Sequence, residues 1–213
     1  MGSISWRPAV GRVHVLLDRF DRHRPLDLAT AALGGGAEVL QLRATHLTDR
    51  ERYELAGPLL AVCREAGAAL IIDDRVDIAV AVEADGVHLG ANDLPVGVAR
   101  ALLGSDALVG ATARDPGSGR ARQEEGASYL GVGPAFATTS KDGLPDPIGV
   151  DGVAAVAAAV TVPVVAIGGV TATGATDLVA AGAHGVALIG AVARADDPRG
   201  AVAAVASAVA GAA

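Results

Sequence analysis

The stretch GPAFATTSKDGLPDP (Gly133–Pro147) carries two threonine hydroxyls, a serine hydroxyl and a lysine ammonium at four successive positions. Lysine and arginine together number 17, and because Lys141 is the one lysine, the remaining sixteen are arginines. A guanidinium is a planar fork, whereas an ammonium is a point charge that can serve two phosphate groups from one position. Thr138, Ser140 and Lys141 are therefore predicted to bind phosphate, with a solvated loop lysine as the alternative.

Glycines stand at two further places that suit a phosphate group. Gly168 and Gly169 lie in AIGGV, directly before a helix that is expected to begin at Thr171, and Ile189–Gly190 closes a later apolar run. Glycine lets the backbone approach a ligand closely, and the N–H groups at the start of a helix favour anions. The pattern favours a phosphate site, and tight turns that bind nothing are the alternative.

Two aspartates have the placement of a magnesium site. Asp74 and Asp93 each follow a short apolar run, and Mg²⁺ in proteins takes one or two carboxylates together with phosphate oxygens of a substrate. Capping of a following helix is an equally common use for such aspartates. His88 differs, because in GVHLG it alternates with apolar residues, so we expect it to point inward as a hydrogen-bonded packing residue.

The elements that must position these residues are short apolar runs separated by helical stretches. Eight strands are expected at Val13–Leu17, Glu38–Arg43, Ala69–Ile72, Gly86–Gly90, Leu108–Thr112, Ser128–Gly133, Pro163–Gly169 and Gly185–Gly190. Strand–helix alternation indicates parallel strands with right-handed crossovers, and eight units predict a single α/β domain over residues 1–213, a (β/α)₈ TIM barrel. An open doubly wound sheet is the alternative, but LLDRFDRHRP stands where it would need a glycine-rich turn.

One helix has clear boundary signals. Thr48, with Glu51 three residues later, predicts a capping box at its start, and Gly67 predicts its end. Pro58 lies inside this stretch and is expected to kink the helix or to split it.

A barrel of this kind carries its working residues where the strands end. Polar residues follow nearly every predicted strand, and the topology would bring them to one mouth. They are Asp18, Gln41, Arg43, Asp73, Asp74, Arg75, Asn92, Asp93, Thr112, Arg114 and Thr138–Lys141.

Bulk composition limits the classes of partner. The 213 residues are 51% hydrophobic but only 2% aromatic, which predicts a core of alanine, valine, leucine and isoleucine. A net charge of −7 argues against nucleic acid and anionic membranes, but not against small phosphorylated substrates. The one cysteine, Cys63, excludes an internal disulfide and is expected to be inert packing. With no apolar run of about 18 residues and no signal-peptide pattern, a cytoplasmic protein is expected. The last helix, nearly all alanine and valine, leaves a homo-oligomer open.

Six ordered motifs resemble those of the thiamine-phosphate synthase family: LQLR, DDRVDIA, ADGVHLGANDLP, YLGVGPAFATTSK, PVVAIGGVT and HGVALIGAV. The resemblance runs from the first strand to the final helix. It implies a (β/α)₈ barrel that joins a hydroxymethylpyrimidine diphosphate to a thiazole phosphate and releases pyrophosphate, with Mg²⁺ as cofactor. In that chemistry Mg²⁺ and basic residues stabilise the departing pyrophosphate, and the thiazole nitrogen captures a pyrimidine carbocation.

The resemblance also implies roles at the matching positions. Asp74 and Asp93 would hold Mg²⁺, Gln41 would bind the pyrimidine, and Lys141 would lie between the leaving diphosphate and the acceptor phosphate. The implied catalytic residues are Arg43, Thr112 and Lys141, and the implied substrate contacts are Gln41, Asp73, Arg114, Thr138, Ser140, Gly168, Gly169, Ile189 and Gly190.

The chain departs from the family's usual pattern at several of these positions. Thr45 stands where lysine is usual and Asp73 where asparagine is usual, so one positive charge is lost and one negative charge is added. Thr112 and Gly190 replace serines, and Arg114 stands near a usual histidine. These departures keep two alternatives open: a thiazole tautomerase-like isomerase, and a phosphate-binding paralogue without catalysis.

Overall fold

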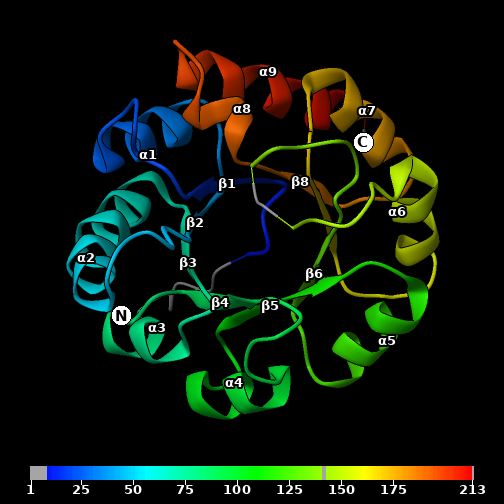
Figure 1. Ribbon diagram of the computed structural model, residues 1–213, viewed down its shortest axis with the longest axis horizontal. Helices are drawn as coiled ribbons and strands as arrows, with labels where there is room; N and C mark the ends of the chain where they lie inside the picture. Colours follow the sequence, from blue (N-terminus) through cyan, green and yellow to red (C-terminus); the bar gives the residue numbers. More distant parts are fainter. Residues whose placement is uncertain (1–8, 141–142, 213) are drawn as a thin grey trace, which may run out of the picture.

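The computed structural model describes residues 9–140 and 143–212. Its sheet has the strands β1 (Val13–Leu17), β2 (Val39–Leu42), β3 (Ala69–Asp73), β4 (Gly86–Leu89), β5 (Leu108–Ala113), β6 (Tyr129–Val132), β7 (Val164–Ile167) and β8 (Gly185–Leu188). All pairs are parallel, and because the last strand pairs with the first, the sheet closes into a barrel (Figure 1). The predicted (β/α)₈ barrel is confirmed, and no predicted strand end differs from the observed one by more than two residues.

Helices follow the strands and form an outer ring around the barrel (Figure 1). They are α1 (Pro25–Gly34), α2 (Asp49–Ala66), α3 (Val76–Ala81), α4 (Val96–Leu103), α5 (Pro116–Glu124), α6 (Gly149–Ala157), α7 (Ala172–Ala180), α8 (Gly190–Ala193) and α9 (Pro198–Gly211). The alanine- and valine-rich α9 packs on α7 and α1 through Val202, Val205 and Val209, so its apolar face is covered by the barrel's own helices. Among the described residues, no helix is both long enough and apolar enough to cross a membrane.

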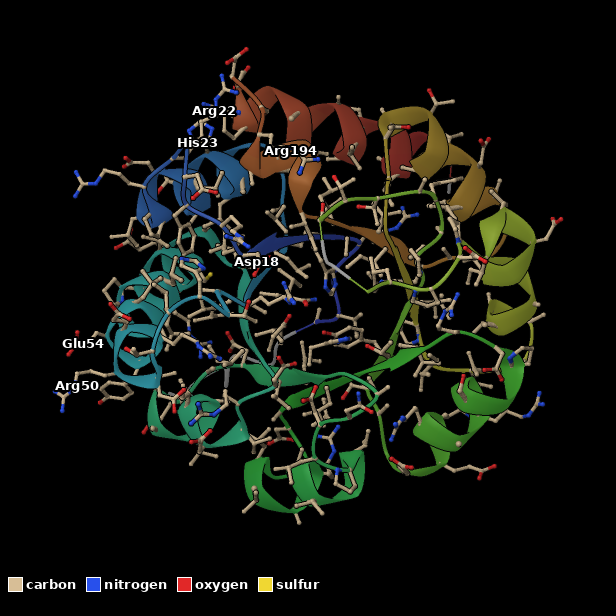
Figure 2. The ribbon with its side chains drawn as sticks, viewed as in Figure 1. Asp18, Arg22, His23, Arg50, Glu54 and Arg194 are labelled. Atoms are coloured by element: carbon tan, nitrogen blue, oxygen red, sulfur yellow. The ribbon has the colours of Figure 1, made fainter. Side chains whose placement is uncertain are left out.

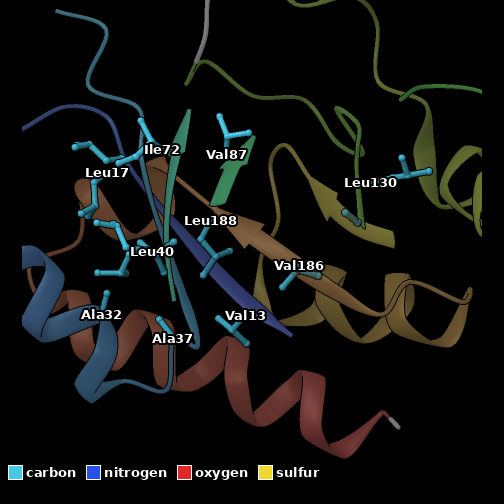
Figure 3. Close-up of a cluster of buried hydrophobic side chains, with 14 of the residues drawn as sticks. Val13, Leu17, Ala32, Ala37, Leu40, Ile72, Val87, Leu130, Val186 and Leu188 are labelled. Carbon is cyan, nitrogen blue, oxygen red and sulfur yellow. The ribbon is translucent and has the colours of Figure 1, made fainter. Parts of the chain in front are cut away.

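The strands bury both of their faces. Residues at alternate positions, such as Leu40, Ile72 and Leu188, pack outward against the helices in one large cluster (Figure 3). Successive strand residues point to opposite faces, so the positions between them face the barrel interior. Two smaller clusters fill that interior: Leu16, Tyr129, Val165 and Ala187 form one, and Val39, Ala69, Ile71 and Leu108 form the other. The barrel is therefore a packed core, and polar side chains find room only near its ends.

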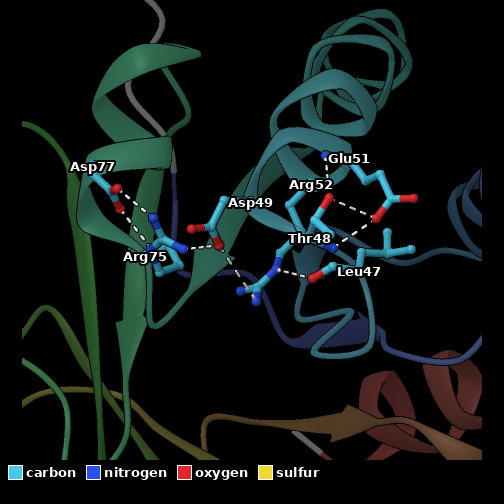
Figure 4. A network of polar contacts seen from close by, with 7 residues as sticks. All are labelled: Leu47, Thr48, Asp49, Glu51, Arg52, Arg75 and Asp77. Atoms are coloured by element: carbon cyan, nitrogen blue, oxygen red, sulfur yellow. Dashed lines mark hydrogen bonds and ion pairs between the residues drawn. The ribbon is translucent and has the colours of Figure 1, made fainter.

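The boundaries of α2 follow the predicted signals. Thr48 and Glu51 form the capping box, each side chain accepting from the other residue's backbone N–H (Figure 4). Gly67 ends the helix with a left-handed φ of 69°. Of the two outcomes expected at Pro58, the split is wrong, because one helix runs from Asp49 to Ala66, and the kink stays a prediction. Both ends of the helix are capped and one face is buried. Together these contributions stabilise the helix by more than the hydrogen bond lost at Pro58 destabilises it. Cys63 is buried on that face, and burial raises the pKa of its thiol to about 12, which makes it inert as predicted.

Candidate functional site

The predicted site residues gather where the strands end. Gln41 lies on β2, Asp73 ends β3, and Thr112 lies on β5, each directly after a residue that packs outward. These three side chains therefore point into the barrel. Asp18, labelled in Figure 2, directly follows β1. Gln41 and Asp73 are 3% and 4% exposed, whereas Thr112 is only half-buried, so the polar set begins deep in the barrel and reaches its surface.

Arg43 is held by a carboxylate that the sequence left without a role. Its Nη1 donates to Asp18 Oδ2 at 2.7 Å, and both side chains are largely buried. No described residue donates to the other oxygen, Asp18 Oδ1. Asp18 was visible as the polar residue directly after the first strand, but pairing across two strands is not encoded in any local pattern.

Asp73 lies inside the barrel beside other carboxylates. Burial raises the pKa of Asp73 well above its usual value, and the neighbouring carboxylates of Asp74, Asp18 and Asp93 raise it further, while Arg43 opposes them. Its Oδ1 is buried and has no described hydrogen-bond partner. The raised pKa favours a neutral carboxylic acid, so counting Asp73 as a full negative charge overstates the charge difference between it and asparagine.

Asp74 and Asp93 lie on neighbouring loops and line one groove, between α3 and α4. Asp74 adopts a left-handed φ of 66°, which is uncommon for a residue with a side chain, and its backbone N–H donates to the carbonyl of His88. Asp93 Oδ2 accepts from the backbone N–H of Gly90 at 2.7 Å. Within residues 9–140 and 143–212, no three histidine, cysteine or acidic side chains cluster as a complete metal site. A cation here would need further oxygens from a ligand.

Gln41 belongs to a buried polar group that includes two residues the sequence reading missed. Its Nε2 lies 2.9 Å from Nδ1 of His14 and 3.3 Å from the hydroxyl of Tyr129. His14 and Tyr129 are fully buried. His14 has the inward position in VHVLL, two residues from Leu16, and that alternation was the signal that could have found it.

His88 extends the same group toward the mouth. Its Nδ1 lies 3.2 Å from the Tyr129 hydroxyl, and its Nε2 lies 3.1 Å from Oγ1 of Thr112. The expectation of an inward, hydrogen-bonded His88 is confirmed. Glycines leave space for both rings: a Cβ on Gly110 would overlap the ring of Tyr129, and a Cβ on Gly131 would lie 2.8 Å from Cε1 of His88.

The paired glycines after β7 serve a packing need. Gly168 and Gly169 both have left-handed φ values, 99° and 64°. A Cβ on Gly168 would lie 2.6 Å from Cβ of Pro134, and one on Gly169 would overlap the carbonyl oxygen of Ala137. The glycines therefore let the loop after β6 lie directly against the loop after β7. They bring the Thr138–Ser140 segment toward this part of the mouth, and their phosphate contact stays a prediction.

The segment that follows β8 departs from a simple turn. Ile189 precedes the short helix α8, and Gly190 is buried. The guanidinium of Arg194 occupies the space where a Cβ on Gly190 would lie, so this position needs a residue without a side chain. Arg194 is labelled in Figure 2 beside α8.

The loop between β6 and α6 holds the remaining predicted residues. The backbone N–H of Ser140 donates to Oγ1 of Thr138 at 3.3 Å. Nη2 of Arg114 donates to the backbone carbonyl of Asp146 at 2.6 Å, and its buried Nε has no described partner. Arg114, which directly follows β5, thus contacts this loop. Lys141 lies outside the described residues.

Arg75 lines the same groove as Asp74 and Asp93, but its side chain is held by other carboxylates. It pairs with Asp77 at 2.6 Å and with Asp49, so it joins the start of α3 to the start of α2 (Figure 4). The guanidinium of Arg75 is thus engaged by Asp49 and Asp77 at the edge of this groove.

Known proteins match this chain over nearly its whole length. A family model described as thiamine monophosphate synthase matches residues 13–192. The chain is 53% identical over 199 residues to a thiamine-phosphate synthase of Salinispora arenicola, covering 92% of this chain and 96% of that one. It is 48% identical over 187 residues to a thiamine-phosphate synthase of Natronomonas pharaonis, covering 87% of each chain. Among solved structures, the thiamine phosphate pyrophosphorylase from Pyrococcus furiosus superposes with a TM-score of 0.86 at 34% identity, covering 94% of this chain and 96% of that one.

Proposed function

The chain belongs to the thiamine monophosphate synthase family, and from this membership we propose that it is a transferase that joins hydroxymethylpyrimidine diphosphate to thiazole phosphate and releases pyrophosphate. The observation that carries the proposal is the 53% identity with the Salinispora arenicola synthase along 92% of the chain.

Arg43 is the residue proposed to bind the diphosphate. Asp18 fixes one end of its guanidinium through the 2.7 Å contact between Nη1 and Oδ2. A guanidinium has five N–H donors, so the remaining ones are available to phosphate oxygens. Lys141, Thr138 and Ser140 are proposed to bind the phosphate groups from the loop after β6, and Gly168, Gly169, Ile189 and Gly190 to bind the thiazole phosphate through the backbone.

Mg²⁺ is the proposed cofactor, held by Asp74 and Asp93. The residues fit this ion, because two carboxylates line one groove and Mg²⁺ usually completes its octahedral shell with water and substrate phosphate oxygens. When bound, the ion would neutralise charge on the departing pyrophosphate. Asp93 retains Oδ1 for such a role, since Oδ2 accepts from the Gly90 N–H.

The loss of a cation at Thr45 is proposed to leave a site that still works. Asp73 is the other charge change, and its raised pKa favours the neutral acid, so the diphosphate would meet a polar group rather than a second anion. Arg43 remains as the cation inside the barrel. The balance of charge is thus closer to that of the family pattern than the sequence alone indicates.

The proposal is tested by supplying the purified protein with both substrates and Mg²⁺ and measuring pyrophosphate release. Release is expected, and Arg43→Ala and Lys141→Ala are each expected to reduce it by at least about tenfold, since each removes a charge-assisted hydrogen bond. Arg50→Ala is the matched control, because Arg50 is 85% exposed on α2 (Figure 2). Absence of release would contradict the proposal, and metal-independent isomerisation of a thiazole carboxylate phosphate would support the isomerase instead.

A further inference from the structure

We propose that His14, Tyr129 and His88 are positioning residues that hold Gln41 and Thr112 in one fixed hydrogen-bonding orientation. The proposal rests on the proposed function and on the roles that the family resemblance implies, pyrimidine binding for Gln41 and catalysis for Thr112. The five side chains come from five strands and form one continuous chain of contacts of 2.9–3.3 Å across the barrel interior. Because each group can only donate or accept in certain ways, the direction of every link can be worked out.

The assignment of donors and acceptors begins at a backbone carbonyl. Nε2 of His14 lies against the carbonyl oxygen of Val10, which can only accept, so Nε2 carries the proton. His14 is fully buried, and burial lowers the pKa of its ring to about 4, so the ring is neutral at neutral pH. A neutral imidazole has one protonated nitrogen. Nδ1 of His14 is therefore an acceptor.

An acceptor at Nδ1 decides which way the Gln41 amide faces. The nitrogen Nε2 must point at His14, where it donates at 2.9 Å, and its second N–H points at the Tyr129 oxygen at 3.3 Å. The amide oxygen then faces away from both partners, and no described residue donates to it. Gln41 thus presents an acceptor, Oε1, and cannot rotate its amide without placing an oxygen against an acceptor.

The donors and acceptors in the second half of this series of hydrogen bonds follow from Tyr129. Its hydroxyl is fully buried and accepts from Gln41, so its own proton needs an acceptor, and Nδ1 of His88 is the described atom within reach at 3.2 Å. The opposite assignment would leave a buried O–H without a partner, which is costly. Nε2 of His88 therefore carries the proton and donates to Oγ1 of Thr112 at 3.1 Å. The hydroxyl proton of Thr112 is left for a ligand.

Two glycines leave the space that the rings of Tyr129 and His88 occupy. Gly110 pairs with Tyr129 across two strands, and the missing side chain leaves the space that the tyrosine ring fills. Gly131 does the same for His88. The outcome is an amide oxygen that accepts at one end of the chain and a half-buried hydroxyl that donates at the other. A ligand that offers an N–H group and a nitrogen lone pair uses both ends, and an aminopyrimidine edge has that chemistry.

The first arm of the test reads the tautomers directly. Protein with ¹⁵N-labelled histidine rings, without substrate, is expected to show protonated Nε2 and unprotonated Nδ1 for both His14 and His88 at pH 7.5, with the signals assigned by single His→Gln variants. Tyr129→Phe is expected to shift the ¹⁵N resonances of the His88 ring and to leave the tautomer of His14 unchanged. Protonated Nδ1 at either ring, or no response of His88 to Tyr129→Phe, would overturn the proposal.

The second arm is kinetic and separates positioning from general damage. Tyr129→Phe removes the hydroxyl that accepts from Gln41 and donates to His88. It is expected to lower kcat/KM for the pyrimidine diphosphate by at least about tenfold and to leave KM for the thiazole phosphate within about twofold. Tyr53→Phe is the matched control, because Tyr53 is the other tyrosine and is 50% exposed on α2. Equal effects on both substrates would contradict a positioning role. A wild-type protein without transferase activity would reject the proposed function, while the tautomers would still decide this inference.

Discussion

The buried imidazole of His14 predicts that the protein loses stability on mild acidification. His14 is fully buried on β1, and its surroundings hold the neutral ring. Burial is the main cause that lowers its pKa from 6.5 to about 4, with a smaller effect of the nearby His184, and the carbonyls of Val10 and Gly11 and the carboxylate of Glu38 act in the opposite direction. The unfolded chain has no such burial, so its His14 titrates near 6.5.

The sign follows from which state binds the proton. Between pH 6.5 and pH 4 the unfolded chain binds a proton at His14 that the folded chain does not. The free energy of unfolding therefore falls as the pH is lowered through this window and is unaffected by His14 above it. Across the whole window, the free energy of unfolding falls by about 3 kcal/mol because of His14. About 2 kcal/mol of this fall occurs between pH 7 and pH 5.

Urea unfolding followed by circular dichroism at a series of pH values measures this loss. His14→Gln removes the titrating group, so the variant is expected to start less stable at pH 7 but to lose about 2 kcal/mol less than the wild type on going to pH 5. His184, whose pKa burial also lowers, is present in both proteins and cancels in the difference. His23→Gln, at a partly exposed histidine that contacts the carbonyl of Ala195, is the control for replacing a histidine by glutamine. Parallel curves for the wild type and His14→Gln would refute the buried neutral imidazole.

Two further predictions concern the loop glycines and the metal. Gly169→Ala is expected to lower the free energy of unfolding by more than about 2 kcal/mol, because it adds a clash with the Ala137 carbonyl to the left-handed φ of 64°; Gly149→Ala, with φ of 70° and open space, should cost about 1 kcal/mol. Equal losses in urea unfolding would show that the loop contact is absent. Removal of Mg²⁺ with a chelator is expected to abolish pyrophosphate release, and Asp93→Asn to raise the Mg²⁺ concentration for half-maximal rate by at least about tenfold. An unchanged Mg²⁺ requirement in Asp93→Asn, judged against the exposed Asp27→Asn, would remove Asp93 from the site.

The sequence predicts the positions of the strands well, because parallel barrel strands are apolar runs with sharp ends. The same alternation predicts that His88 faces inward, which the structure confirms. What alternation does not predict is which inward residues meet. Gln41 and Tyr129 are 88 positions apart, and their contact depends on barrel closure and on the space left at Gly110.

The glycines after β7 show a different limit. A glycine pair before a helix predicts close backbone approach, and the structure has that approach, but the partner is the chain itself. The Pro134–Ala137 segment occupies the side of Gly168 and Gly169 where a Cβ would project. Sequence cannot tell a ligand from a neighbouring loop here, because both need the same absence of a side chain.

Charge is the property for which sequence reasoning is least complete. Counting Asp73 as an anion assumes that the residue keeps its solution pKa, yet Asp73 is 4% exposed and lies beside other carboxylates. The carboxyl group of Asp73 resembles the amide it replaces in size, and when neutral it also lacks charge. His14 follows the same rule in the opposite direction, because burial removes the proton that solution near pH 6 would supply. In both cases burial moves the pKa in the direction that favours the neutral form. Under the proposed function, a neutral Asp73 would not compete with the diphosphate for the guanidinium of Arg43.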